Sequence, residues 1–240
     1  MISKRNFFSF LSLISFWVSL WALFGLSEDA LALTFSNKVP PAVQSQMLGD
    51  LQLVQQIQGT GATPIFAKMF SGPLGGVSLT QFFTTRIFGV DLNNCGGGAA
   101  AACVIPKIND HVMFLTPNFV NLPIPQIYRI SIVFHESRHT ETAQNNWGHV
   151  ICPTPFKDAQ GKDIRGIISG TLMQGLPACD NTPFGAYALQ AELLKNVQYF
   201  CSNCNDKIKM DAKLFGDDTV NRISDARALQ VLRTDVQLAQ

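Results

Sequence analysis

Residues 123–139 read PIPQIYRISIVFHESRH. Pro123 and Pro125 suit the start of a helix, where the N–H that proline lacks would have no partner. Apolar residues then recur at helical spacing, at positions 127, 130, 133 and 134. Charge is scarce until the final turns, as is typical of a helix buried in a domain centre with its polar end on a cleft. The stretch therefore predicts a central helix ending in two histidines.

The last five residues bring together two imidazoles and a carboxylate. Residues four apart lie on one face of a helix, so His135 and His139 can offer ring nitrogens to one metal ion. Glu136 is placed to take a proton from a water bound to that ion. The H-E-x-x-H pattern predicts a zinc site of a hydrolase. The alternative is a buried helix whose histidines are hydrogen-bonded core residues.

A catalytic zinc takes three protein ligands and leaves a fourth position for water, so one more ligand is needed. His149 follows His139 across a segment suited to a sharp turn, and a cross-link at Cys152 could fix it. Glu192 is the second candidate, a carboxylate from a later predicted helix. Imidazole suits zinc, which slightly favours His149. For Glu192 the alternative is an exposed salt bridge to Lys195.

Three further side chains are secondary candidates. Glu141 follows the motif closely enough to accept a hydrogen bond from a ligand histidine, although a solvated helix end explains it equally well. Tyr187 could donate a hydrogen bond to a developing oxyanion, or could serve only in packing. Arg138 could pair with Glu141 and brace the helix.

Residues 1–32 are predicted to be a signal peptide. Lys4 and Arg5 precede an apolar stretch at 7–26, and Ala-Leu-Ala at 30–32 has the small residues that a signal peptidase prefers. The mature chain would begin near Leu33 and be secreted or periplasmic. An uncleaved anchor is the alternative, because the apolar stretch approaches the length of a bilayer span. The membrane would be contacted only through such a leader.

The six cysteines of an exported chain predict disulfides before metal ligands. Proximity in sequence suggests three pairs: Cys95 with Cys103, Cys152 with Cys179, and Cys201 with Cys204. The last pair could instead be a redox C-x-x-C, but no thioredoxin-like pattern surrounds it. The connectivity is a hypothesis, since sequence alone does not determine it.

The rest of the chain predicts an α+β fold. Sequence patterns predict a helix from Pro41 to near Gly59, short strands over 65–92, a surface loop at 95–103, a strand at 111–115, an irregular stretch at 145–182, a helix over 184–200 and one or two surface helices over 206–233. Together these describe a single domain at 33–240. A small, mostly antiparallel sheet would pack on the motif helix, with further C-terminal helices and disulfide-stapled loops. The net charge of +1 indicates no nucleic-acid partner.

The motif at 135–139 and the strand at 111–115 that precedes its helix resemble the zincin superfamily of zinc metallopeptidases. The resemblance implies that His135 and His139 bind zinc and that Glu136 is the general base. It also implies that the preceding strand lines the cleft and holds an extended peptide by main-chain hydrogen bonds. The longer H-E-x-x-H-x-x-G-x-x-H pattern is absent, because positions 142 and 145 are Thr and Asn. This indicates an exported subgroup of its own.

These observations predict an exported zinc-dependent hydrolase, and most directly a peptidase acting on a peptide or protein. Glu136 would take a proton from the zinc-bound water and return it to the leaving amine. The main alternative is a non-catalytic, disulfide-stapled binding protein with a structural or vestigial metal site. Four protein ligands, with both His149 and Glu192 on the ion, would favour that alternative. A third possibility is a leader-anchored envelope protein with a glycine-rich contact loop.

Overall fold

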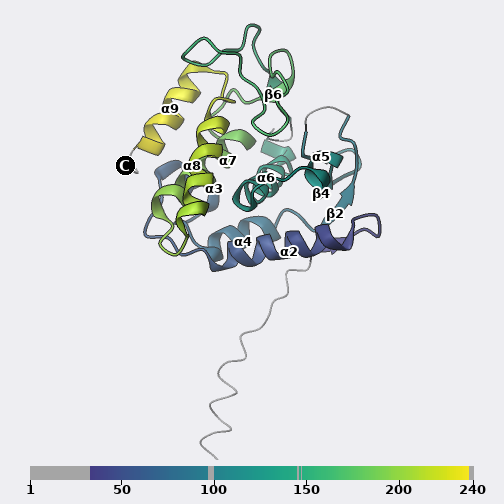
Figure 1. The fold of residues 1–240 in the computed structure, drawn as a ribbon. Coiled ribbons are helices and arrows are strands. Elements are labelled where there is room, and N and C mark those ends of the chain that lie inside the picture. The colour runs from purple at the N-terminus through teal and green to yellow at the C-terminus, as the bar shows by residue number, and fades with distance from the viewer. Residues whose placement is uncertain (1–32, 97–99, 145, 147, 238–240) are drawn as a thin grey trace, which may run out of the picture. The chain divides into compact units, whose positions relative to one another are not determined.

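The computed structural model describes residues 33–96, 100–144, 146 and 148–237. Residues from Leu33 onward cluster into one compact unit, shown as the coloured ribbon in Figure 1. The predicted signal peptide at 1–32 lies outside the described residues and stays a prediction. Within the described ranges, no helix combines the length and the apolar character that crossing a bilayer requires.

The described residues form a mixed α+β arrangement in which helices outnumber strands. The strands are β1 (Thr34–Phe35), β2 (Gly89–Leu92), β3 (Ala102–Ile105), β4 (Asn109–Leu115), β5 (Val150–Ile151) and β6 (Pro177–Cys179). The helices are α2 (Pro41–Gln56), α3 (Pro64–Phe70), α4 (Gly76–Thr84), α5 (Pro117–Asn121), α6 (Gln126–His139), the 3-10 turn η1 (Thr142–Gln144), α7 (Ala186–Phe200), α8 (Asp206–Val220) and α9 (Ala226–Gln237). The predicted small sheet with C-terminal helices is confirmed.

The larger sheet has the strand order β1-β2-β4-β3. β1 pairs with β2 and β2 with β4 in parallel, and β3 pairs with β4 antiparallel. The prediction of a mostly antiparallel sheet is therefore wrong. Parallel neighbours need a crossover connection, and helices α2 to α4 supply it between β1 and β2.

The prediction of short strands over 65–92 is wrong for most of that range. Residues 64–70 and 76–84 are the helices α3 and α4, and strand structure begins only at Gly89. Pro64 opens α3, and the Thr63 hydroxyl caps it by accepting from the backbone N–H of Phe66. Phenylalanine, which is common in strands, instead recurs here at helical spacing, and Phe66 stacks on Phe70 at 4.3 Å between ring centroids. Core packing outweighs strand propensity in this segment.

Helix α6 lies in the interior of the described unit, as predicted for the motif helix (Figure 1). It contacts α2, α4, α7 and α8 as well as strands β3 and β4. Phe134 is fully buried, and its ring lies against the rings of Phe70, Phe82 and Phe83. These contacts fix the rotation of α6 about its own axis, and they thereby fix the orientation of the face that carries His135 and His139.

The three predicted disulfides are all formed: Cys95–Cys103, Cys152–Cys179 and Cys201–Cys204. The second closes the irregular stretch before α7 and joins a small core with Phe156, Ile164 and Met173. Disulfides persist in oxidising surroundings, so these bonds fit an extracellular or periplasmic location.

Candidate metal centre

Three histidines converge on one point at the end of α6. The Nε2 atoms of His135, His139 and His149 lie 3.1 Å from one another in every pairing. The first two are only 6% exposed, and His149 approaches from the segment before β5. Three nitrogens bound to one tetrahedral zinc at about 2.0–2.1 Å would lie about 3.3–3.4 Å apart. The observed triangle fits such an ion closely, and the cluster can hold a metal.

The other nitrogen of each ring faces an oxygen. The Nδ1 partners are Gln190 Oε1 for His135 at 3.1 Å, the Asn146 carbonyl for His139 at 2.6 Å, and Asp180 Oδ1 for His149 at 2.9 Å. Carbonyl and carboxylate oxygens only accept, so each Nδ1 must carry the ring proton. The Gln190 amide is oriented by donating its Nε2 hydrogen to Ser131 Oγ. Each Nε2 therefore points a lone pair at the other two, an arrangement that a cation stabilises.

Burial keeps two of these rings uncharged. Desolvation lowers the pKa of His135 well below its usual value, and the charges of His139 and His149 lower it further. Desolvation and the neighbouring His149 bring the pKa of His139 to about 3. Both rings are thus neutral at pH 7, which is the form that binds metal.

The Cys152–Cys179 bond connects the parts of the chain that supply and orient His149. Asp180 directly follows one of these cysteines, and its Oδ2 accepts from the backbone N–H of Tyr187 at 2.7 Å. A Cβ at Gly185 would lie 2.2 Å from that same oxygen, so only glycine lets the carboxylate approach the start of α7 this closely. The disulfide and the helix start together hold the carboxylate that fixes the His149 ring.

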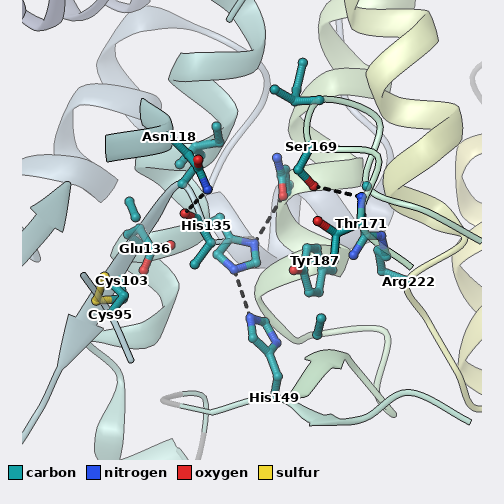
Figure 2. Close-up of a pocket in the computed structure, with 18 of the residues that line it drawn as sticks. Cys95, Cys103, Asn118, His135, Glu136, His149, Ser169, Thr171, Tyr187 and Arg222 are labelled. Carbon is teal, nitrogen blue, oxygen red and sulfur yellow. Dashed lines mark hydrogen bonds between the residues drawn. A yellow bond between two sulfur atoms is a disulfide. The ribbon is translucent and has the colours of Figure 1, made fainter. Parts of the chain in front are cut away.

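Glu136 lies at the same cavity with one carboxyl oxygen unused (Figure 2). Its side chain is buried, and within the described ranges Oε2 has no hydrogen-bond partner. Desolvation raises the pKa of Glu136 to about 8, which a hydrogen bond from the Val104 N–H only partly offsets. A buried acceptor without a partner costs about 1–3 kcal/mol, so this oxygen is available to a water or a proton donor in the cavity.

The cavity has a volume of about 470 Å³, within the range of pockets that take a small ligand. Its walls come from α6, α7, the loop before β6 and strand β3. The strand at 111–115, expected to line the cleft, does not do so, because β4 lies inside the sheet between β2 and β3. The N–H of Val104 faces Glu136, so Ala102, two residues earlier, turns its main-chain groups to the same side of β3, away from β4.

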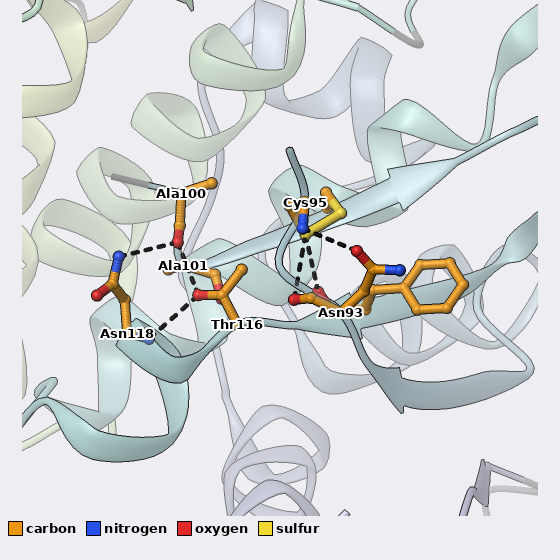
Figure 3. The surroundings of a disulfide bond; sticks show 8 residues. Asn93, Cys95, Ala100, Ala101, Thr116 and Asn118 are labelled. Carbon is orange, nitrogen blue, oxygen red and sulfur yellow. Dashed lines mark hydrogen bonds between the residues drawn. A yellow bond between two sulfur atoms is a disulfide. The ribbon is translucent and has the colours of Figure 1, made fainter. Parts of the chain in front are cut away.

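Hydrogen bonds and a disulfide fix the N-terminal end of β3 (Figure 3). The Thr116 hydroxyl contacts the carbonyls of Ala100 and Ala101 at 2.7 and 2.9 Å. The Asn118 amide donates to the Ala100 carbonyl at 3.2 Å, and the Cys95–Cys103 bond holds the start of the strand. The backbone of residues 100–103, at the rim of the cavity, is therefore held in place by several contacts.

Glu192, the alternative third ligand, lies apart from the histidines and does not line the cavity. It is fully buried, and its Oε2 accepts from the Thr63 hydroxyl at 2.7 Å and from Asn196 Nδ2 at 3.1 Å. Two residues on a helix turn the side chain to roughly the opposite face, so Gln190 reaches His135 and Glu192 cannot. Its expected salt bridge to Lys195 is also absent among the described contacts, since Lys195 pairs with Asp217.

The secondary candidates have distinct places. Tyr187 lines the cavity and stacks on His149 with ring centroids 4.6 Å apart. Glu141 touches no ligand ring but accepts from Asn146 Nδ2 at 3.0 Å, and it thereby steadies the residue whose carbonyl holds His139. Arg138 pairs with Glu141, as predicted.

Gln190, Asp180 and Arg222 belong to the site, although the sequence patterns do not indicate them. The first two orient the candidate ligand histidines, and nothing in their local sequence signals this, apart from the position of Asp180 beside Cys179. Arg222 lies in the range 206–233, for which the sequence predicts surface helices. It is in fact only 6% exposed and lines the cavity.

Imidazole nitrogen suits zinc, copper, iron and nickel, so the donor set alone does not select one metal. The convergent lone pairs, the neutral rings and the adjacent cavity nevertheless make this a site that can bind a metal and a further ligand. No protein-family model, no curated protein and no solved structure matches this chain, and its own geometry is the basis for assigning a function.

Proposed function

We propose that this chain is an exported zinc-dependent hydrolase, and most directly a peptidase of the zincin type. The observation that carries the proposal is the set of three lone pairs on His135, His139 and His149, each fixed by a hydrogen bond at Nδ1. These three residues would hold the ion. Bound zinc would supply a Lewis acid and make a bound water more acidic.

Glu136 moves the proton in this proposal. Burial raises the pKa of Glu136, and the charge of a cation held by the three histidines would lower it again and favour the carboxylate. Oε2, which has no hydrogen-bond partner among the described residues, would then accept a proton from water, and the same carboxyl would return that proton to the leaving amine nitrogen. Tyr187 can donate a hydrogen bond to charge that develops on the carbonyl oxygen. Burial raises the pKa of Tyr187, which keeps its hydroxyl protonated at pH 7.

Strand β3 offers a way to hold a peptide. An edge strand can accept an extended chain as an additional strand through main-chain hydrogen bonds. Ala102 presents such groups beside Glu136 at the rim of the cavity. In the proposal, this edge positions the scissile carbonyl near the histidines, which is the role predicted from the sequence for residues 111–115.

The number of ligands separates this proposal from the non-catalytic alternative. A structural zinc is closed by four protein ligands, whereas catalytic sites keep one position open. In the parts of the chain that the structure describes, the cluster contains three histidines, and Glu192 is bonded elsewhere. This arrangement supports the hydrolase.

Elemental analysis of the purified chain tests the proposal. We expect about one zinc per chain, its loss in His149→Ala, and its retention in the control Glu192→Ala. Cleavage of a peptide mixture should stop with a chelator and return when zinc is added. A chain that carries no zinc, or that cleaves equally well in the chelator, would contradict the proposal.

A further inference from the structure

Arg222 places a buried positive charge in the metal cavity. It follows α8, is 6% exposed, and lines the cavity together with the histidines. Figure 2 shows it on the far side of Tyr187 from His135. Its Cζ lies 5.4 Å from the Tyr187 ring centroid, and that centroid lies 4.5 Å from the centroid of His135. One tyrosine ring thus separates the guanidinium from the candidate metal site.

The hydrogen-bonding capacity of Arg222 is largely unused. Its Nη1 faces the sulfur of Met173, a weak acceptor, and its nearest carboxylate oxygen, on Asp218, lies 4.0 Å from Nη2. Its Nε has no partner within the described ranges. Arg129 shows the contrast, because its Nε and Nη2 contact both carboxylate oxygens of Asp50 at 2.8 and 2.7 Å. Arg222 lacks the paired acceptor that a buried guanidinium normally has.

A buried charge without a close counter-ion is unfavourable, and an anion that enters the cavity would relieve it. The planar guanidinium matches a carboxylate in shape and charge. Among the described residues that line the cavity, no lysine and no further arginine stands beside Arg222, so the side chains there suit a singly charged anion.

We propose that Arg222 binds a substrate carboxylate while the scissile carbonyl lies at the histidine cluster. This inference rests on the proposed hydrolase function and narrows it to short peptides that carry a carboxylate a short distance from the bond to be cleaved. A free C-terminus and an Asp or Glu side chain share this chemistry. Most directly the enzyme trims peptides from the C-terminal end, since a cavity of about 470 Å³ has room for only a short segment.

Matched peptides test the specificity. We expect kcat/KM to be about 10- to 100-fold higher for a peptide with a free C-terminus than for the same peptide as its amide. A third peptide is amidated and carries Glu in place of Gln near its C-terminal end. Its kcat/KM shows whether a side-chain carboxylate can replace the free C-terminus. Arg222→Gln should remove the preference, and Arg227→Gln, a change at an exposed arginine of the same segment, should leave it intact.

Binding provides a readout independent of turnover. Isothermal titration calorimetry with N-acetyl-alanyl-alanine and its amide, on chain with and without zinc, separates Arg222 from the metal, to which a carboxylate can also bind. The acid should bind at least about tenfold more tightly than the amide even without zinc, and Arg222→Gln should abolish this difference. Arg222→Met, which keeps an apolar stem and removes the guanidinium, should abolish the difference as well, and its thermal unfolding transition checks that the variant is folded.

The possible failures are distinguishable. Equal affinities for acid and amide, together with equal cleavage of both peptides, would overturn the carboxylate site and leave zinc-dependent hydrolysis standing. Carboxylate binding that depends on Arg222 in a chain without zinc or hydrolysis would support the anion site and overturn the proposed function.

Discussion

The hydrogen bond at each Nδ1 determines what the Nε2 of the same ring can do. An imidazole has a single proton when neutral, and an acceptor at Nδ1 holds that proton there and leaves Nε2 as a ligand. Asp180 does this for His149 and also accepts from the backbone N–H of Tyr187 in the first turn of α7. The side chains that set the tautomers are therefore as much a part of the candidate site as the ligands.

Asp180→Asn should weaken metal binding without removing a ligand. An amide at this position holds the His149 ring less firmly and supplies no negative charge, so we expect zinc affinity to fall about 10- to 100-fold. Competition with a chromophoric chelator measures this change. Asp163→Asn, in the same loop at a solvent-exposed ion pair with Lys157, is the matched control. Unchanged affinity in the Asp180 variant would show that this hydrogen bond does not orient the ligand.

Glu136→Gln should separate metal binding from turnover. The glutamine keeps the size of the side chain but cannot accept and return a proton, and general acid–base catalysis contributes about 10²- to 10⁴-fold. We expect kcat to fall by that factor at unchanged zinc content, measured on one protein preparation. Undiminished hydrolysis would refute the role given to Glu136.

At the scale of elements, Glu192 links three helices. Thr63 precedes α3, Asn196 lies one turn further along α7, and Asp235 of α9 stands close enough to raise the pKa of the Glu192 carboxyl. Desolvation is the larger cause, and the pKa rises from 4.5 to about 8. The carboxyl is therefore protonated in the folded chain at neutral pH, where an unfolded chain would have released the proton.

This difference predicts how stability depends on pH. Between pH 4.5 and about 8 the folded chain holds one more proton at Glu192 than the unfolded chain does. This group's contribution to the free energy of unfolding is thus greatest below pH 4.5, falls as pH rises, and levels off above about pH 8. Glu136 has the same raised pKa and adds to the slope. Denaturant titrations across this range should show the combined slope, and Glu192→Gln should make it clearly shallower. An unaltered slope in the variant would mean that another group is responsible.

The Cys152–Cys179 bond should influence both stability and metal affinity. Its ends are 27 residues apart, a loop whose closure stabilises the folded chain by about 3–4 kcal/mol. Replacing both cysteines by serine should lower the free energy of unfolding by that amount and weaken zinc binding, because His149 and Asp180 flank the bond. Serine replacement of Cys201 and Cys204, which do not line the cavity, is the control and should leave zinc affinity unchanged.

For the whole molecule, the features that depend on residues close together in the sequence could be predicted. The spacing of apolar residues located α2, α6 and α7, and proximity in sequence gave the three disulfides. The preference of zinc for imidazole selected His149. Each of these depends on neighbouring residues or on the chemistry of a single side chain.

Contacts between distant segments were not predictable. The parallel pairing of β2 with β4 depends on how the chain returns between β2 and β3, which no local pattern encodes. The phenylalanines of α3 and α4 pack around α6 and override their strand propensity. Arg222 reaches the cavity, and Asp180 reaches the His149 ring, only because α7 and α8 pack beside α6.

Export is a prediction for the entire chain. Lys4, Arg5 and the apolar residues after them predict removal of residues 1–32, and the three disulfides need an oxidising compartment to form. Mass spectrometry of the exported chain should find an N-terminus near Leu33 and a mass lower by six hydrogens than that of the reduced form. An intact N-terminus would instead support a retained anchor.

The shortness of strand β3 limits aggregation of the protein through strand pairing. An exposed sheet border invites pairing with a second molecule and can start aggregation. Here that border is only four residues long, it is interrupted by a register shift after Val104, and two of its residues, Ala102 and Val104, are buried. Such a border can receive a brief guest segment, but it gives another copy of the protein too little length for lasting strand exchange.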